Sequence, residues 1–313
     1  MGKLAFIFPG QGSQTVGMGK DFYDHFDYSK RIFETSNEAL NENFSSLIFD
    51  GPQNELTLTT NAQPALLTTS IAILEKVKEL GVEPDYVAGH SLGEYSALVA
   101  SNVITFQDAV KIVRKRGEYM EDAVPNGEGT MAAILGMDRE ILQKVTDEIT
   151  ANGHSVQLAN LNCPGQIVIS GTKEGVMKAC ELAKTQGAKR AIPLDVSGPF
   201  HSRLMEAAAE KFSTLLEQYT FCDAKYEVIS NVTASPISNG ETIKELLIKQ
   251  LYSPVLWEDS VRKMIELGVD TFVEIGPGKV LTGLVRKIDR DVKTFNIFDL
   301  PSFEQTIAQL KGE

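Results

Sequence analysis

The residues Gly89-His90-Ser91-Leu92-Gly93 have the spacing of a nucleophile elbow, in which a serine stands between two glycines. They follow a short apolar stretch, Tyr86–Ala88, and precede a helical pattern over Glu94–Ala100. The glycines let the backbone turn sharply from strand to helix, which exposes the Ser91 hydroxyl. The turn also directs the Leu92 amide and the helix N-terminus at the negative oxygen formed on attack. We therefore predict a nucleophilic serine, the alternative being a glycine-rich turn whose serine caps the helix.

A serine hydroxyl needs a general base, and the chain has four histidines. His201 lies in the loop Ser197-Gly198-Pro199-Phe200-His201-Ser202, directly before a helical stretch, where a side chain can project into a cleft. His25 and His154 lie among polar residues, and His90 would point away from the serine beside it. His201 is therefore the predicted base, with a structural histidine as the alternative.

An arginine interrupts the apolar stripe of a predicted helix over Asp108–Val124. The stripe consists of Ala109, Ile112, Val113, Met120, Ala123 and Val124. Arg116 falls in its middle, and burying an unpaired arginine is strongly unfavourable. The side chain must therefore either meet a structural carboxylate or bind an acidic substrate, and the residues alone leave both open.

The first predicted strand, Leu4–Phe8, ends in the loop Phe8-Pro9-Gly10-Gln11-Gly12-Ser13-Gln14. This loop lacks the Gly-Lys-Ser/Thr of a nucleotide-binding loop. Loops after parallel strands open at the carboxyl edge of the sheet, where ligands bind. The Gln11 amide could therefore complete an oxyanion hole, or the loop could be a plain turn.

The elements that must position these residues predict an α/β fold. Short apolar stretches alternate with longer ones of helical period, as expected of a parallel sheet buried on both faces. The predicted strands are Leu4–Phe8, Tyr86–Ala88, Glu227–Ser230, Thr271–Ile275 and Thr294–Ile297. The predicted helices include Pro64–Glu79, with proline at the first helical position, and Arg203–Tyr219.

Residues 126–197 break this alternation. Their order of strand, helix, strand, strand, helix, strand is that of a ferredoxin-like unit. The elements are predicted at Thr130–Leu135, Asp138–Thr150, Val156–Asn162, Gln166–Ser170, Thr172–Thr185 and Arg190–Val196. We expect a small ferredoxin-like domain over residues 126–197, inserted into a larger α/β domain formed by residues 1–125 and 198–313.

The bulk composition excludes several classes of protein. The 313 residues are 42% hydrophobic and 23% charged, as in a globular protein with a full core. No segment reaches membrane length and the first apolar stretch is too short for a signal peptide, so a cytoplasmic location is expected. The three cysteines lack the spacing of a zinc site or a disulfide framework, so no metal is expected. A formal net charge of -12 disfavours nucleic acid.

Taken together, the motifs resemble the malonyl-CoA:acyl-carrier-protein transacylase family of type II fatty-acid synthesis. The motifs that carry the resemblance are Phe8-Pro9-Gly10-Gln11-Gly12-Ser13-Gln14, Gln63-Pro64-Ala65, Gly89-His90-Ser91-Leu92-Gly93-Glu94, Arg116-Gly117 with Met120, and Gly198-Pro199-Phe200-His201-Ser202. They occur in the family's order and spacing over nearly the whole chain. The family fold, a hydrolase-like parallel-sheet core with an inserted ferredoxin-like domain, agrees with the elements above.

The resemblance also implies a role for each matching residue. The catalytic residues would be Ser91 as nucleophile, His201 as base, Gln250 through its backbone carbonyl, and Gln11 and Leu92 through their backbone amides. The residues around the substrate would be Arg116, which binds the malonyl carboxylate, together with Gln63, His90, Met120 and Phe200.

The implied activity moves a malonyl group from coenzyme A to the pantetheine thiol of acyl carrier protein, through a malonyl-serine ester in a ping-pong cycle. Such an enzyme would supply fatty-acid biosynthesis without a cofactor, since coenzyme A and pantetheine are substrate carriers, and we expect a monomer. One alternative is a serine esterase or thioesterase in which water takes the acyl group. Another is an acyl-CoA-binding protein without catalysis.

The family's carrier protein is strongly acidic, as this chain also is, so a local basic patch must attract it. Two clusters of basic residues could form this patch. One consists of Lys184, Lys189 and Arg190 beside the last strand of the inserted domain, and the other of Arg286, Lys287 and Arg290 after Gly276-Pro277-Gly278. The alternative is that both are ordinary solvated surfaces.

Overall fold

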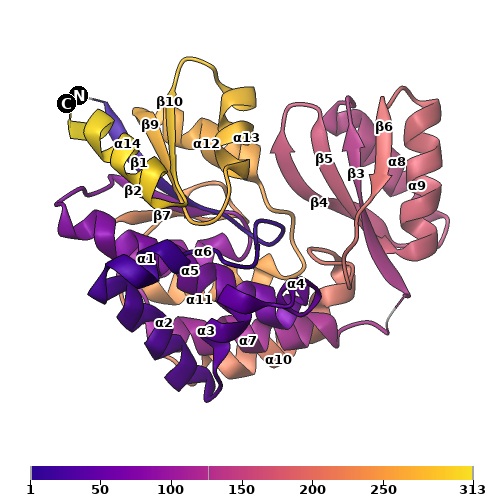
Figure 1. The fold of residues 1–313 in the computed structure, drawn as a ribbon. Coiled ribbons are helices and arrows are strands. Elements are labelled where there is room, and N and C mark those ends of the chain that lie inside the picture. The colour runs from indigo at the N-terminus through magenta and orange to yellow at the C-terminus, as the bar shows by residue number, and fades with distance from the viewer. Residues whose placement is uncertain (1, 126, 312–313) are drawn as a thin grey trace.

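The computed structural model describes residues 2–125 and 127–311. These residues form two sheets, each covered by helices, with the smaller sheet beside the larger one (Figure 1). The predicted domain boundary at residue 126 and the two ends of the chain lie outside the described residues. Among residues 2–125 and 127–311, no helix is both long and apolar enough to cross a membrane.

Within the described residues, the larger sheet has the strand order β10-β9-β1-β2-β7-β8. Its strands are β1 (Lys3–Phe8), β2 (Tyr86–Gly89), β7 (Glu227–Ile229), β8 (Pro236–Ile237), β9 (Val269–Ile275) and β10 (Lys293–Ile297). The five predicted strands are confirmed and pair in parallel, and the unpredicted β8 pairs antiparallel with β7. The parallel arrangement brings the carboxyl ends of β1, β2 and β7 to one edge.

Both faces of this sheet are buried, because alternate residues of β1 enter two different hydrophobic clusters. Phe6 and Phe8 enter the larger cluster, whereas Ala5 and Ile7 enter the other. The larger cluster is completed by α1 (Lys20–His25), α2 (Asp27–Leu40), α3 (Phe44–Asp50), α4 (Gln53–Thr57), α5 (Thr59–Glu79), α6 (Gly93–Ala100), α7 (Phe106–Glu121), η1 (Arg203–Met205), α10 (Glu206–Leu216), α11 (Gly240–Gln250) and α14 (Leu300–Lys311). The other is completed by α12 (Trp257–Glu266) and α13 (Val280–Ile288).

The smaller sheet has the order β4-β5-β3-β6, with every neighbouring pair antiparallel. Its elements are β3 (Gly129–Leu135), α8 (Arg139–Ala151), β4 (Val156–Cys163), β5 (Gln166–Thr172), α9 (Lys173–Thr185) and β6 (Arg190–Pro193). Helices α8 and α9 enclose a separate hydrophobic cluster with this sheet. The ferredoxin-like topology predicted from the element order is therefore confirmed.

Several predicted helix and strand ends were wrong. Pro64 lies inside α5 rather than at its first position, because burial of nearly the whole helix outweighs the local preference of proline. Helix α7 begins at Phe106, where Thr105 Oγ1 accepts a hydrogen bond from Asp108 N. Strand β6 ends at Pro193, and the predicted Arg203–Tyr219 helix starts as a 3₁₀ turn and ends at Leu216.

Backbone hydrogen bonds join the two parts directly. Val255 N donates to Ala159 O (2.8 Å), and Leu161 N donates to Val255 O (2.9 Å). Strand β4 is thereby fixed against the segment between α11 and α12. The smaller sheet thus forms one wall of a cavity at the carboxyl edge of the larger sheet.

Candidate active site

Ser91 lies at a sharp turn between β2 and α6, as the elbow spacing predicted. Its backbone has φ 51°, in the left-handed region that non-glycine residues rarely adopt. A Cβ at Gly89 would lie 1.9 Å from the carbonyl carbon of Gly93, and one at Gly93 would lie 2.1 Å from Phe8 O. Both positions therefore require glycine, and the close packing holds the serine in its strained conformation.

The Ser91 hydroxyl meets the predicted base. Its Oγ lies 2.8 Å from His201 Nε2, and His201 Nδ1 lies 2.8 Å from the backbone carbonyl oxygen of Gln250. Because a carbonyl only accepts, Nδ1 carries the proton and leaves Nε2 free to accept one. Burial, aided by the positive charge of Arg116, lowers the pKa of His201 to about 3. The imidazole is therefore neutral at ordinary pH, as a general base must be.

Arg116 is buried, with 1% of its surface exposed, and it lies beside the same hydroxyl. Its Nη2 donates to Ser91 Oγ (3.2 Å) and to Gln250 Oε1 (2.8 Å), and its Nη1 donates to Gln63 Oε1 (2.7 Å). Each of these partners is uncharged. Within the described residues, no carboxylate bonds directly to the guanidinium, which lies next to the nucleophile and can receive an anionic group.

The remaining predicted substrate and oxyanion residues converge on one cavity of about 940 Å³. Its lining includes Gln11, His90, Ser91, Leu92, Arg116, Met120, Phe200 and His201. Among the described residues, neither the backbone amide of Gln11 nor that of Leu92 donates a hydrogen bond to another backbone group. His90 turns toward the smaller sheet, where its Nε2 lies 2.8 Å from Asn162 Oδ1. Its side chain is therefore separate from the Ser91–His201 pair, as expected.

Two residues of this site were not predicted from the sequence. Asn231 holds the elbow from both sides: its Oδ1 accepts from Ser91 N (2.7 Å) and its Nδ2 donates to Gly89 O (2.7 Å). Its place directly after a predicted strand was a usable signal, because it lies at the same sheet edge. Glu94 is buried on α6 and bonded to the Gln250 side chain. A lone acid in an apolar helix is the same signal that identified Arg116.

The two predicted basic clusters lie outside the lining of this cavity but close to each other. Lys287 Nζ donates to Gln166 Oε1 (3.2 Å) at the start of β5. The preceding Gly165 accepts a hydrogen bond from Gly136 N (2.8 Å), and a Cβ at Gly136 would lie 2.6 Å from Lys189 Cγ. Both clusters therefore border the turn between β4 and β5. The exposed side chains of the basic pairs at 189–190 and 286–287 form no salt bridge within the part of the chain that the structure describes.

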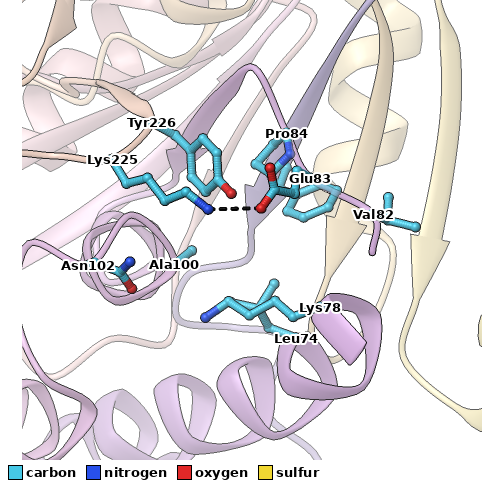
Figure 2. Close-up of a pocket in the computed structure, with 10 residues that line it drawn as sticks. Leu74, Lys78, Val82, Glu83, Pro84, Ala100, Asn102, Lys225 and Tyr226 are labelled. Atoms are coloured by element: carbon cyan, nitrogen blue, oxygen red, sulfur yellow. Dashed lines mark hydrogen bonds and ion pairs between the residues drawn. The ribbon is translucent and has the colours of Figure 1, made fainter. Parts of the chain in front are cut away.

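A second cavity, of about 190 Å³, lies at the amino ends of β2 and β7 (Figure 2). Its charged side chains are exposed and already paired: Lys225 Nζ donates to Glu83 Oε1 (2.8 Å), and Lys78 Nζ donates to Glu75 Oε1 (3.1 Å). The lining contains no serine, cysteine or histidine. It therefore lacks both a nucleophile and a base of these types.

Comparisons with known proteins agree with this geometry. Residues 5–300 match the acyl transferase domain family. The malonyl CoA-acyl carrier protein transacylase of Bacillus subtilis (strain 168) is 61% identical over 313 residues, covering 100% of this chain and 99% of that protein.

Solved structures give the same result. The malonyl CoA-acyl carrier protein transacylase of Clostridium perfringens is 45% identical with a TM-score of 0.96, covering 99% of this chain and 98% of that one. A type II PKS acyl-carrier protein in complex with its malonyl-transacylase contains a chain 41% identical to this one with a TM-score of 0.95, covering 99% and 100% of the two chains. The family resemblance and the predicted fold class are confirmed, and the chain belongs to the acyl transferase family.

Proposed function

We propose that this chain transfers a malonyl group from coenzyme A to the pantetheine thiol of acyl carrier protein, through an ester on Ser91, and so supplies fatty-acid biosynthesis. The observation that carries the proposal is the position of one hydroxyl between two groups. Ser91 Oγ lies 2.8 Å from a neutral imidazole and 3.2 Å from a buried guanidinium. The imidazole can take the hydroxyl proton, and the guanidinium can hold a carboxylate on the acyl group. The two relatives are named malonyl CoA-acyl carrier protein transacylases, and these names contain both proposed carriers of the malonyl group, coenzyme A and acyl carrier protein.

In the first half-reaction, the Ser91 proton moves to His201 Nε2 as Oγ attacks the thioester carbonyl carbon. The negative oxygen of the resulting tetrahedral intermediate is held by the amides of Gln11 and Leu92. The carbon–sulfur bond then breaks, the proton on His201 passes to the departing thiolate, and coenzyme A leaves. A malonyl ester on Ser91 remains.

The second half-reaction reverses these steps with a different thiol. His201 takes the proton of the pantetheine thiol, whose sulfur attacks the ester carbonyl. The ester carbon–oxygen bond breaks, and the proton returns to Ser91 Oγ. No metal or redox cofactor takes part in these steps.

Arg116 gives the site its preference for a malonyl group. Its charged hydrogen bonds to a carboxylate are worth roughly 1.5–3 kcal/mol each, and an acetyl group cannot form them. Gln63 and Gln250 hold the guanidinium in place by accepting hydrogen bonds from it. The carboxylate of the acyl group therefore orients its thioester toward Ser91.

The carrier protein is proposed to dock against the basic pairs at 189–190 and 286–287. Within the described residues these cations form no salt bridge, and they border the turn after β4, the strand whose Asn162 contacts His90. A carrier bound there would insert its pantetheine along the wall of the smaller sheet. The cytoplasmic location and the monomeric state stay predictions.

Mass spectrometry after mixing with malonyl-CoA separates the proposal from the alternatives. We expect a malonyl adduct that persists without a thiol acceptor and disappears when pantetheine-loaded carrier is added. Rapid release of free malonate would instead indicate a thioesterase. Absence of any adduct would indicate a binding protein and would reject the proposal.

A further inference from the structure

Glu94 is a buried carboxylate that the proposed reaction does not use. Only 1% of its surface is exposed. Its Oε2 accepts hydrogen bonds from Gln250 Nε2 (2.7 Å) and from Asn231 N (3.2 Å). Burying a carboxylate is strongly unfavourable unless hydrogen bonds and an opposite charge offset the lost hydration. The hydrogen bonds are present, so the opposite charge remains to be identified.

The opposite charge is Arg116, and one amide separates the two residues. Gln250 Oε1 accepts from Arg116 Nη2 (2.8 Å), while Gln250 Nε2 donates to Glu94. The amide therefore presents its oxygen to the cation and its N–H to the anion, which is the favourable direction of its dipole. Arg116 and Glu94 influence each other's ionisation, with each charge favouring the other. Without substrate, Glu94 thus supplies the negative charge that balances Arg116.

We propose that Glu94 is a positioning residue that balances the charge of Arg116, and that Glu94 takes up a proton when a substrate carboxylate binds there. The inference rests on the proposed malonyl transfer. Before binding, the charges of Glu94 and Arg116 sum to zero. A malonyl carboxylate adds a second negative charge beside a single buried cation, and a proton taken from solvent by Glu94 removes the excess.

Protonation of Glu94 requires little free energy near neutral pH. Burial raises the pKa of Glu94 to about 7, although its hydrogen bonds and the charge of Arg116 oppose the rise. A substrate carboxylate on Arg116 would offset that charge and raise the pKa further. At a pH somewhat above 7, Glu94 is therefore mostly ionised in the free protein and mostly protonated in the complex.

The histidines and the tyrosine beside Arg116 do not change charge in this range. Burial, aided by Arg116, lowers the pKa of His201 to about 3, and burial also lowers the pKa of His90. Burial raises the pKa of Tyr95, whose ring centroid lies 5.4 Å from the Arg116 guanidinium carbon. Glu121 of α7 lines the same cavity, and burial raises the pKa of its carboxyl, but Glu94→Gln leaves Glu121 in place and so separates its effect from that of Glu94.

Two substitutions separate the charge of Glu94 from its hydrogen bonds. Both hydrogen bonds end on one oxygen, so the carbonyl of Glu94→Gln can accept both while the charge is lost. Glu94→Ala loses the bonds as well and should slow acylation by every acyl-CoA, because Gln250 also orients His201. Glu274→Gln is a matched control. Glu274 is equally buried and burial raises its pKa, but it accepts hydrogen bonds from Leu281 N and Thr282 N at the start of α13.

Calorimetry measures the proton directly. Malonyl-CoA is titrated into Ser91→Ala, which binds without reacting, in two buffers of different ionisation enthalpy at about pH 7.5, just above the pKa of the free carboxyl. We expect an uptake of up to about three-quarters of a proton per site, since a carboxyl with this pKa is already partly protonated in the free protein. We expect no uptake with acetyl-CoA, and none with malonyl-CoA when Glu94→Gln is added. Adding Glu274→Gln should leave the uptake unchanged. Zero uptake in Ser91→Ala, or equal uptake after Glu94→Gln, would overturn the proposal.

The unmodified active site allows a second measurement. The ratio of the acylation rates with malonyl-CoA and acetyl-CoA cancels effects on Ser91 and His201. In the wild type this ratio should fall as the pH rises above about 7, by up to roughly tenfold per unit, since ionised Glu94 then opposes the substrate carboxylate. In Glu94→Gln the ratio should stay flat at the low-pH value. A flat wild-type ratio would contradict the coupling, whereas the absence of any malonyl adduct would reject the proposed function itself.

Discussion

The two cavities lie at opposite ends of the same parallel sheet and differ in how their charges are arranged. At the amino ends of β2 and β7, Lys225 and Glu83 are exposed and bonded to each other (Figure 2). At the carboxyl ends, Arg116 and His201 are buried and both bond to one hydroxyl. Exposed pairs are screened by water, whereas buried groups act on one another strongly.

The two cavities differ because different loops connect the strands at the two ends of the sheet. The carboxyl ends of β1, β2 and β7 lead directly into loops that carry Gln11, Ser91 and Asn231. The smaller sheet forms one wall of the space above them, and Arg116 and His201, which converge there, are buried. Charged residues in the lining of a cavity are therefore not enough to identify an active site. A better criterion is that several side chains bond to one atom that can react.

The largest expected effect is that of removing the base. His201→Ala should slow acylation by malonyl-CoA by roughly 10²- to 10⁴-fold, because general-base catalysis is lost. The rate is measured by rapid quenching and mass spectrometry. His90→Ala is the control, since His90 bonds to Asn162 rather than to Ser91. A near-normal rate in His201→Ala with an inactive His90→Ala would transfer the role to His90.

The next effect should depend on the substrate. Arg116→Ala should reduce acylation by malonyl-CoA roughly ten- to a hundredfold, the equivalent of one charged hydrogen bond, and should keep acylation by acetyl-CoA. Arg114→Ala on the same helix is the control, because Arg114 bonds to Glu42 and Asn61 instead. If both substrates lost activity equally, Arg116 would be a structural residue.

A smaller effect is expected at the basic surface. Reversing Lys189 and Arg190, or Arg286 and Lys287, to glutamate should raise KM for the carrier several-fold and leave acylation by malonyl-CoA unchanged. Added salt should weaken the wild-type reaction with the carrier in the same selective way. Reversal of the exposed Lys30 and Arg31 on α2 is the control. Unaltered carrier kinetics in both double variants would place docking on another surface.

The smallest effect is expected at the second cavity. Lys225→Gln should leave both half-reactions unchanged, because its exposed pair with Glu83 contacts no residue of the Ser91 site. The measurement is steady-state transfer from malonyl-CoA to the carrier. A clear loss of activity with normal thermal unfolding would show that the two ends of the sheet are coupled.

Local spacing predicted the parts of the site that depend on local geometry. The elbow glycines identified Ser91, because both contacts that exclude a Cβ arise within the strand–turn–helix and its neighbouring strand. The apolar stripe identified Arg116 as buried, but it did not decide whether the partner of Arg116 is a structural carboxylate or an acidic substrate. The structure reconciles them: a carboxylate is present in Glu94, yet Gln250 separates it from the guanidinium, which leaves room for an acidic group.

Long-range contacts explain what the sequence could not predict. The side chain of Gln250 comes from α11 and meets α6 and α7 only after folding, so its spacing from Glu94 carries no local signal. The short helices α1, α3 and α4 are similarly undetected, because each is held by the common hydrophobic cluster rather than by its own pattern. Helix α5 keeps Pro64 inside it for the same reason.

The most direct test of the account is the position of the acyl ester. The wild type, Ser91→Ala and Ser197→Ala are each mixed with malonyl-CoA, digested and mapped by mass spectrometry. Ser197→Ala is the control, because Ser197 is a second serine that lines the same cavity. We expect one malonyl group on the peptide that contains Ser91 in the wild type and in Ser197→Ala, and none in Ser91→Ala. An undiminished adduct in Ser91→Ala would contradict the account.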